Sequence, residues 1–219
     1  MTFTREQLTE QIIHAGQFLY AQGWSPATSS NYSARLSSNQ VLLTVSGKHK
    51  GLLNAEDILA TDLHAKSLEP HKKPSAEALL HTQLYNWRAD VQAVLHTHSV
   101  NATVLSRLVA AEYIEFNGYE LQKAFQGINS HEQPLLVPVF ENDQDIPRLA
   151  EQVQRWLDMH PDCQGYLIRG HGLYTWGTSM QEALRHIEAF EFLLACELKV
   201  RACTAQHSVH QDNAYPLND

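Results

Sequence analysis

Two histidines at the end of a predicted strand, His96 and His98, constrain the fold of this chain more than any other feature. The preceding residues 91–95 are apolar and partly β-branched, which predicts an interior strand. Side chains two positions apart on a strand point to the same face, so both imidazoles are expected on one side. Ser99 then follows as a helix N-cap before the helical pattern of residues 100–110. A buried strand is therefore predicted to run into a helix, where ligand sites concentrate in α/β proteins.

A third histidine, His171, lies between two glycines far along the chain. Taken singly, each of the three is explained more simply as a polar residue on a solvated strand face or in a turn. Two unpartnered imidazoles at the end of a buried strand would, however, be costly. We therefore expect His96, His98 and His171 to bind one divalent ion and to leave a coordination position open. Imidazole ligands suit zinc best, with iron, manganese and cobalt as alternatives. Most of the 13 histidines, His81 among them, lie in polar or helical surroundings and indicate nothing further.

Composition and charge narrow the classes of function. A length of 219 residues fits one domain, and a hydrophobic content of 43% is that of a globular protein. The net charge is −8 and no run of Lys or Arg occurs, so a nucleic-acid partner is not expected. Three cysteines are too few for a disulfide framework. No signal-peptide pattern and no apolar run of membrane-spanning length is seen, so we expect a cytoplasmic protein with no membrane partner.

Helical and strand patterns alternate irregularly along the chain. Apolar spacing and capping residues predict helices at residues 4–22, 74–87, 99–110, 119–125, 145–157 and 179–202. Strand patterns are seen at residues 31–36, 41–45, 91–98, 135–140 and 165–168, and the first two predict an antiparallel hairpin. The fold class is therefore α/β (α+β): a single three-layer α/β/α domain around a mixed, largely antiparallel sheet. The domain is expected to cover residues 1–203, with residues 204–219 as a C-terminal tail.

Two polar loops and two carboxylates are further candidates. Residues 27–33 and 45–50 combine hydroxyls, an amide, a glycine and lysines, which is what a phosphate group needs. A polar hairpin and loop explains them equally well. Glu77 follows a Pro-Ser helix start, where the helix dipole alone favours a carboxylate. Glu120 fits a solvated helical face, so neither carboxylate stands out without the histidines.

Taken in order, these motifs resemble the class II aldolase superfamily over residues 5–203. The motifs are Thr28-Ser-Ser-Asn31, Ser46-Gly47, Pro74-Ser-Ala-Glu77, His96-Thr-His98 and Gly170-His171-Gly172. Three longer segments are most similar to the dehydratase members: Ser46-Gly-Lys-His-Lys50, Tyr119-Glu-Leu-Gln-Lys-Ala124 and His171-Gly-Leu-Tyr-Thr-Trp-Gly177. One departure is Ser30, because many relatives have glycine at this position, and a Cβ there restricts backbone approach to a ligand.

The resemblance implies a role for each matching residue. It makes His96, His98 and His171 the ligands of one Zn²⁺ per subunit. Glu120, 22 residues after His98, corresponds to the general acid/base of the dehydratases. Glu77 corresponds to a carboxylate that serves the aldolases as acid/base and, without substrate, as a further metal ligand. The implied phosphate pocket consists of Thr28, Ser29, Ser30, Asn31, Ser46, Gly47 and Lys50.

The resemblance further implies a metal-dependent carbon–oxygen lyase of methionine salvage, which removes water from a phosphorylated ketose. A class II sugar-phosphate aldolase or a pentulose-phosphate 4-epimerase is the alternative, because both use the same metal and the same kind of substrate. A binding domain without activity is disfavoured because all three histidines are present. A structural zinc is disfavoured because it normally has four protein ligands, including cysteines. A homotetramer with active sites near subunit boundaries is also implied.

Overall fold

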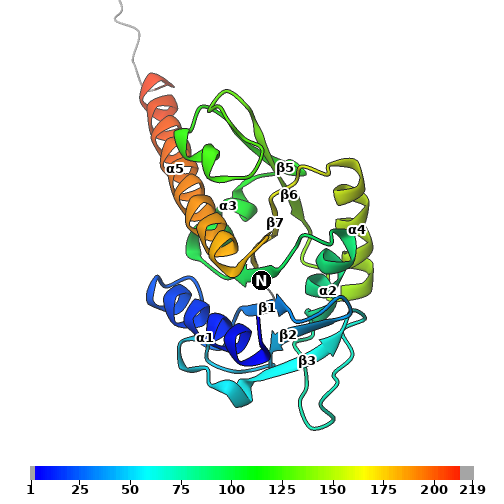
Figure 1. Ribbon diagram of the computed structural model, residues 1–219. Coiled ribbons are helices and arrows are strands. Elements are labelled where there is room, and N and C mark those ends of the chain that lie inside the picture. The colour runs from blue at the N-terminus through cyan, green and yellow to red at the C-terminus, as the bar shows by residue number, and fades with distance from the viewer. Residues whose placement is uncertain (1–2, 213–219) are drawn as a thin grey trace, which may run out of the picture.

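The computed structural model describes the backbone of residues 3–212 and the side chains as far as residue 204. Within that range eight strands form one sheet in the order β3-β2-β1-β4-β8-β7-β6-β5 (Figure 1). The strands are β1 (Asn31–Arg35), β2 (Gln40–Thr44), β3 (Ile58–Asp62), β4 (Ala93–Thr97), β5 (Tyr113–Phe116), β6 (Leu135–Phe140), β7 (Gly165–Ile168) and β8 (Gly172–Gly177). All neighbouring strands are antiparallel except β6 and β7, which run parallel, so the expected mixed and largely antiparallel sheet is confirmed.

Five α-helices cover both faces of this sheet. They are α1 (Arg5–Ala21), α2 (Ala78–Trp87), α3 (Val100–Leu108), α4 (Ile146–Met159) and α5 (Met180–Asp212). Short 3₁₀ turns, η1 (Lys50–Leu52), η2 (Ala55–Asp57) and η3 (Glu120–Ala124), lie in the connections. Figure 1 shows α1 and α5 on one side of the strands and α2 and α4 on the other. Apolar residues of α1, α3 and α5 form one buried cluster, and those of α2 and α4 form a second cluster on the opposite face of the sheet. The three-layer α/β/α arrangement is therefore confirmed.

Strand alternation decides which face each side chain of the central strands meets. On β4, Leu95 belongs to the cluster beneath α1, α3 and α5, whereas Val94 belongs to the cluster beneath α2 and α4. His96 lies two residues after Val94 and therefore faces the α2 side. Its partner across the ladder is Tyr174 of β8, which packs in the same α2-side cluster.

Local signals in the sequence explain several element boundaries. Thr4 forms the predicted capping box with Gln7 at the start of α1. The helix ends before Gly23, whose φ of +77° is the left-handed conformation that glycine adopts without strain. The predicted hairpin is formed by β1 and β2, with Ser33 opposite Leu43.

Three strands and one helix end differ from the sequence expectation. Strands β3, β5 and β8 were not predicted, because β3 is short and polar at one end, β5 has only four residues with a glutamate among them, and β8 begins and ends with glycine. Helix α5 runs to Asp212, past the expected end near residue 202, so the first part of the expected tail is helical. Residues 201–212 contain neither glycine nor proline, the residues that most often end a helix, so the helix can continue through them. Residues 213–219 lie outside the described part.

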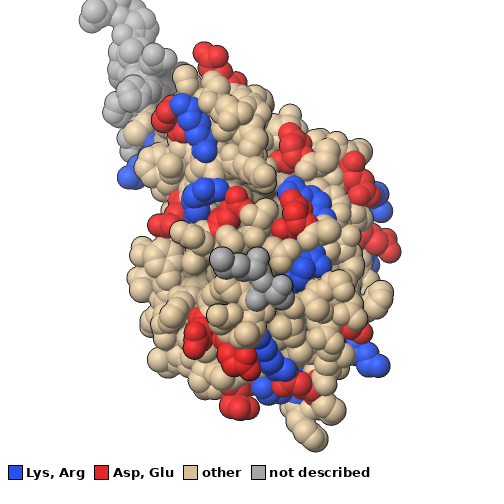
Figure 2. All heavy atoms as spheres, in the orientation of Figure 1, with Lys and Arg blue, Asp and Glu red and all other residues tan. Residues whose placement is uncertain are grey.

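The surface carries charges of both signs. On the face shown in Figure 2, Lys and Arg side chains alternate with Asp and Glu, and they form no continuous basic area there. In the part of the chain that the structure describes, no helix combines the length and the apolar character needed to cross a membrane.

A cluster of charged residues ties the start of α1 to the sheet edge. The Glu69 carboxylate accepts from Arg5 Nη2 at 2.5 Å, from the Ala60 backbone amide at 2.9 Å and lies 3.1 Å from Lys72 Nζ. Burial raises the pKa of Glu69, but Arg5, the Ala60 amide and Lys72 outweigh it and lower the pKa to about 2. A pKa below that of the unfolded chain stabilises the fold, and this contribution is lost as the pH falls through the folded value.

We predict that Glu69→Gln lowers the free energy of unfolding by about 1–2 kcal/mol at pH 7, after allowance for solvent screening. The full difference is present above the ordinary pKa of 4.5 and shrinks as the pH falls towards 2. Denaturant unfolding at several pH values measures it. Glu56→Gln is the control, because that carboxylate is 89% exposed and lies as far as 3.8 Å from Lys72 Nζ, so its loss should change the free energy of unfolding little. If Glu69→Gln lowered the free energy of unfolding equally at every pH, the stabilisation could not come from the lowered pKa of Glu69.

Candidate metal centre and active site

The three histidines singled out in the sequence come together at one end of the central strands. His96 lies on β4, His98 directly follows it, and His171 lies in the turn between β7 and β8. One ring nitrogen of each lies within 4.8 Å of the corresponding nitrogen of the other two. The ring centroids are 4.5–5.0 Å apart, and the Nε2 atoms of His96 and His171 are separated by 3.3 Å.

Two glycines allow His171 to reach the other histidines. The turn is tight, because the His171 amide donates to the carbonyl of Ile168. Gly170 has a φ of +65°, which favours glycine. A Cβ on Gly172 would lie 2.0 Å from the carbonyl oxygen of Thr97, so only glycine lets β8 approach β4 this closely. The Gly-His-Gly pattern is thus a packing requirement that places an imidazole beside β4.

Hydrogen bonds on the outer side of two rings fix their tautomers. Nδ1 of His96 donates to the carbonyl of Leu173 at 3.0 Å, and Nδ1 of His171 donates to Oδ1 of Asn142 at 3.3 Å. A neutral imidazole has one N–H, so each Nε2 keeps a lone pair that points into the shared space. Burial lowers the pKa of His96 well below its usual range and lowers that of His98 to about 4. The rings of His96 and His98 are therefore neutral near pH 7, as metal ligands must be.

Glu77, at the start of α2, completes this arrangement. Its Oε1 lies 3.1 Å from Nε2 of His171, and its Oε2 lies 3.5 Å from Nε2 of His96. Oε2 also accepts from Asn31 Nδ2 at 2.8 Å and from the Tyr174 hydroxyl at 3.1 Å. Burial raises the pKa of Glu77, but the hydrogen bond from the Asn31 amide favours the ionised form of the carboxylate and lowers its pKa.

The chemistry of this donor set fits a divalent cation. Imidazole lone pairs and an ionised carboxylate face the same small space, and with nothing positive between them they repel one another. Three nitrogen donors, two of them on rings with an outer hydrogen bond, resemble a catalytic zinc site, which keeps a position for water or substrate. A cavity of about 270 Å³ opens beside the group, lined among others by Glu77, His98, Asn142 and His171.

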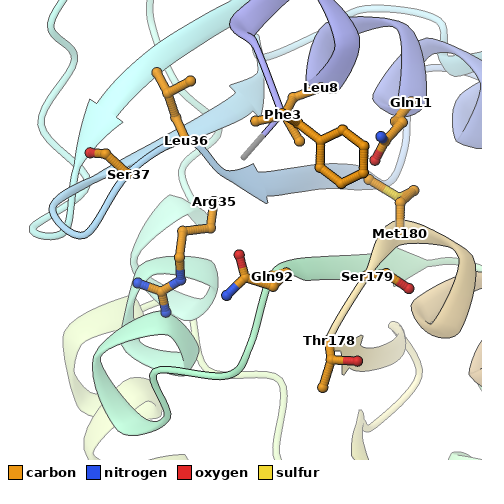
Figure 3. A pocket seen from close by; sticks show the side chains of 10 residues that line it. All are labelled: Phe3, Leu8, Gln11, Arg35, Leu36, Ser37, Gln92, Thr178, Ser179 and Met180. Atoms are coloured by element: carbon orange, nitrogen blue, oxygen red, sulfur yellow. The ribbon is translucent and has the colours of Figure 1, made fainter. Parts of the chain in front are cut away.

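A larger hollow lies elsewhere in the molecule. It has a volume of about 350 Å³ and is lined by residues that include Phe3, Arg35 and Met180 (Figure 3). Arg35 ends β1, whereas Asn31 at the other end of that strand contacts Glu77. The Arg35 guanidinium donates to backbone carbonyls, including that of Val91 at 2.8 Å. The hollow is therefore apart from the histidines, and its arginine is already engaged.

The predicted phosphate residues divide into two groups. Lys50 is buried, and its Nζ donates to the carbonyl oxygens of Thr28 at 3.3 Å and Lys48 at 2.6 Å, which joins the two polar loops. Burial lowers the pKa of Lys50 to about 8, against the opposing effect of Asp57. Thr28 is exposed in the first loop, as are Ser46 and Gly47 in the second. These residues stay predicted contacts.

The remaining members of the predicted pocket are less open to a ligand. The Ser29 hydroxyl donates to the carbonyl of Pro26 at 2.6 Å. Ser30 is buried and has a φ of +71°, which explains why glycine suits this position. The side chain of Asn31 hydrogen-bonds with Glu77 and His81. Its contact with a phosphate stays a prediction, and in this structure Asn31 shares a strand face with the metal-binding side of the fold.

Glu120 is not brought to the histidines within the described chain. It begins η3, its side chain is 74% exposed, and Oε1 pairs with Lys123 Nζ at 2.6 Å. His131 Nδ1 lies 3.8 Å from the same carboxylate. Hydrogen bonding to Lys123 lowers the pKa of Glu120, so the group is ionised. Any contact between Glu120 and a metal centre therefore requires a second subunit or a movement of this segment.

Three residues of the site were not predicted from the sequence: Asn142, Tyr174 and His81. Asn142 follows the end of β6 and orients His171, and Tyr174 stacks on His96 with ring centroids 4.0 Å apart. Nothing in the sequence marks Tyr174 as a site residue, because tyrosine is common in apolar strands. A lone asparagine after a strand is equally common in loops.

Comparisons with known proteins agree with this architecture. The family described as Class II Aldolase and Adducin N-terminal domain matches residues 10–198. A methylthioribulose-1-phosphate dehydratase of Pseudomonas fluorescens (strain Pf0-1) is 69% identical over 202 residues, which cover 92% of this chain and 97% of that protein. A protein of the same name from Azotobacter vinelandii is also 69% identical, with 92% and 98% covered.

Solved structures show the same fold. An L-fuculose-1-phosphate aldolase from Thermus thermophilus superposes with a TM-score of 0.74 at 25% identity, covering 92% of this chain and 99% of that one. YgbL from Klebsiella pneumoniae, described as a putative aldolase/epimerase/decarboxylase, has a TM-score of 0.76 at 24% identity, with 90% and 91% covered. The resemblance seen in the motifs is confirmed, and the chain belongs to the class II aldolase family.

Proposed function

We propose that this protein is a zinc-dependent dehydratase that converts 5-methylthioribulose-1-phosphate to 2,3-diketo-5-methylthiopentyl-1-phosphate and water, in methionine salvage. The observation that carries the proposal is the convergence of three imidazoles and Glu77 beside a cavity. The substrate is taken from relatives that are 69% identical over nearly their whole length. The enzyme would work in the cytoplasm as a homotetramer.

His96, His98 and His171 would hold the zinc ion. When bound there, a divalent cation acts as a Lewis acid that polarises the substrate's ketone oxygen and makes the adjacent C–H more acidic. The reaction removes a proton from C3 and the hydroxyl group from C4, and the two leave together as one water. The enol that remains loses the proton of its C3 hydroxyl and gains a proton at C4, which gives the 2,3-diketone. Glu77 is ionised and faces the cavity, so it is suited to accept a proton from substrate held there.

Glu120 is proposed to deliver the proton to the departing hydroxyl group. Because it is exposed and, among the described residues, has no contact with the three metal-site histidines of its own chain, we propose that it lies at a subunit boundary. In that arrangement Glu120 of one subunit serves the metal centre of a neighbour. The ion pair with Lys123 keeps the Glu120 carboxylate ionised beforehand, so the proton that it delivers to the hydroxyl group would first pass to it from C3, directly or by way of Glu77.

The substrate's phosphate is proposed to bind between the two polar loops that Lys50 joins. An ammonium group has three N–H donors, and the carbonyls of Thr28 and Lys48 use two of them. The third is then available to a phosphate oxygen, together with the exposed hydroxyls of Thr28 and Ser46. Holding the phosphate end would align the reacting carbons with Glu77.

The proposed function predicts which substrate the protein accepts. Purified protein loaded with zinc is expected to release one water from methylthioribulose-1-phosphate and to leave L-fuculose-1-phosphate and ribulose-5-phosphate unchanged. Mass spectrometry of the products detects each outcome. Cleavage of fuculose phosphate into two fragments would identify an aldolase, and interconversion of pentulose phosphates would identify a 4-epimerase.

A further prediction concerns the position of Glu120. We expect Glu120→Gln to retain zinc and to lose at least about a hundredfold in kcat, the usual contribution of a general acid or base. His171→Gln should lose zinc and activity together. Co-expression of the two inactive chains is then expected to restore activity, because about a quarter of randomly assembled boundaries combine an intact triad with an intact Glu120.

Co-purification with two different affinity tags isolates the mixed assemblies, and each single variant prepared in the same way is the control. Undiminished turnover by Glu120→Gln would remove this residue from the mechanism. Mixed assemblies that stay inactive would show that Glu120 does not act across a subunit boundary.

A further inference from the structure

A chain of buried polar side chains leads away from Glu77 into the core. Asn31 contacts Glu77 on one side and His81 Nε2 on the other. His81 Nδ1 lies 2.7 Å from the Ser33 hydroxyl, which lies 2.8 Å from the Tyr85 hydroxyl. Apart from the carboxylate itself, every member is at most 4% exposed, so water does not compete for these hydrogen bonds.

Two matching periodicities create this chain of contacts. Glu77, His81 and Tyr85 are spaced by four residues and therefore lie on one side of α2. Asn31 and Ser33 are spaced by two residues and therefore lie on one face of β1. The polar side of the helix thus lies against the polar face of the strand, and each strand residue contacts two helix residues. Ordinary core packing would place apolar side chains at these positions.

The direction of every hydrogen bond follows from Glu77. An ionised carboxylate only accepts, so Asn31 must turn its Nδ2 towards Glu77 and its Oδ1 towards His81. His81 must then donate from Nε2. Burial lowers the pKa of His81 to about 3, so the ring is neutral and its Nδ1 is an acceptor. The hydroxyl proton of Ser33 is the donor to that nitrogen.

The Ser33 oxygen is then left as an acceptor, and the Tyr85 hydroxyl donates to it. All protons in the chain therefore point towards Glu77. Reversal would require the amide oxygen of Asn31 to face the carboxylate, which is possible only with a protonated carboxyl group.

We propose that Asn31, His81, Ser33 and Tyr85 form a directional hydrogen-bond relay that orients the Glu77 carboxylate, with His81 as its central positioning residue. The relay and the Tyr174 hydroxyl both bind Oε2, which leaves Oε1 turned towards His171. The relay thus selects which carboxylate oxygen meets the substrate and the metal. The catalytic part of this proposal rests on the proposed function, whereas the geometric part does not.

The direct test uses the unaltered protein. Nitrogen-15 NMR of histidine-labelled protein distinguishes a protonated from an unprotonated ring nitrogen. His81 is expected to be neutral, with the proton on Nε2, in both the metal-free and the zinc-loaded protein. A proton on Nδ1 would reverse the chain and overturn the proposal, even if every variant described below behaved as expected.

The second test compares two substitutions of His81. His81→Gln places an amide N–H near the position of Nε2, so it can still donate to Asn31, whereas His81→Leu cannot. We expect His81→Leu to lower kcat by about 10–100-fold with KM nearly unchanged, and to weaken zinc binding by about tenfold or more. His81→Gln should recover most of both losses. Equal losses in the two variants would reduce His81 to a packing residue.

A pair of tyrosines supplies the matched control. Tyr85→Phe removes the hydroxyl at the far end of the relay and is expected to lower kcat by a smaller factor than His81→Leu. Tyr166 is equally buried, but its hydroxyl has no hydrogen-bond partner in the described part of the chain, so Tyr166→Phe should leave kcat unchanged. Equal effects of Tyr85→Phe and Tyr166→Phe on kcat would show that Tyr85 is not part of the relay.

Zinc affinity, measured by competition with a chromogenic chelator, separates failure of this proposal from failure of the proposed function. If the unaltered protein does not act on methylthioribulose-1-phosphate, the function is wrong. The relay is then still tested by two results: the order of zinc affinities among the His81 variants, and the tautomer of His81 seen by NMR. Unchanged affinity and unchanged kcat in His81→Leu would overturn it.

Discussion

The antiparallel pairing of β4 with β8 is the contact on which the rest of the structure depends. It places His96 opposite Tyr174, and it brings the turn that carries His171 against the end of β4. The close approach is possible because Gly172 has no side chain to collide with the carbonyl of Thr97. Three polar rings are thereby concentrated in a protein interior, which is costly unless something satisfies them.

The surrounding residues reduce that cost in one particular way. Backbone and side-chain acceptors bind the outer nitrogens of His96 and His171, so the lone pairs of their inner nitrogens converge. Glu77 adds a negative charge to the same space, and its own neighbours hold it in the ionised form. Donors arranged in this manner destabilise an empty interior and stabilise a bound cation. The site is therefore built at the expense of local stability, as functional sites commonly are.

Much of this could be predicted from the residues alone. The His-x-His pair after an apolar strand and the glycines around His171 were sufficient to predict the triad, because few structural roles need such spacing. The layers and the mixed sheet also followed from the alternation of helical and strand patterns. Strand β8 was not predicted, because glycines at both of its ends weaken the strand pattern, and its role depends on its partner β4.

Other features depend on tertiary contacts that the sequence does not reveal locally. Asn31 was assigned to a phosphate, but its strand face turns its amide towards Glu77. His81 was not singled out, although its spacing of four from Glu77 and from Tyr85 was visible. A period of four marks any helix face, and only the opposing Asn31 and Ser33 make it a hydrogen-bonded chain. The position of Glu120 depends on assembly, which a single chain does not contain.

The central claim is that three histidine nitrogens bind one divalent ion. X-ray absorption spectroscopy of the zinc-loaded protein tests it most directly. We expect one zinc per chain with three imidazole nitrogens at roughly 2.0–2.1 Å, completed by oxygen ligands. Substitution of His171 by glutamine should remove one nitrogen from that shell. A zinc with sulfur ligands, or a shell that is unchanged when His171 is replaced, would contradict this account.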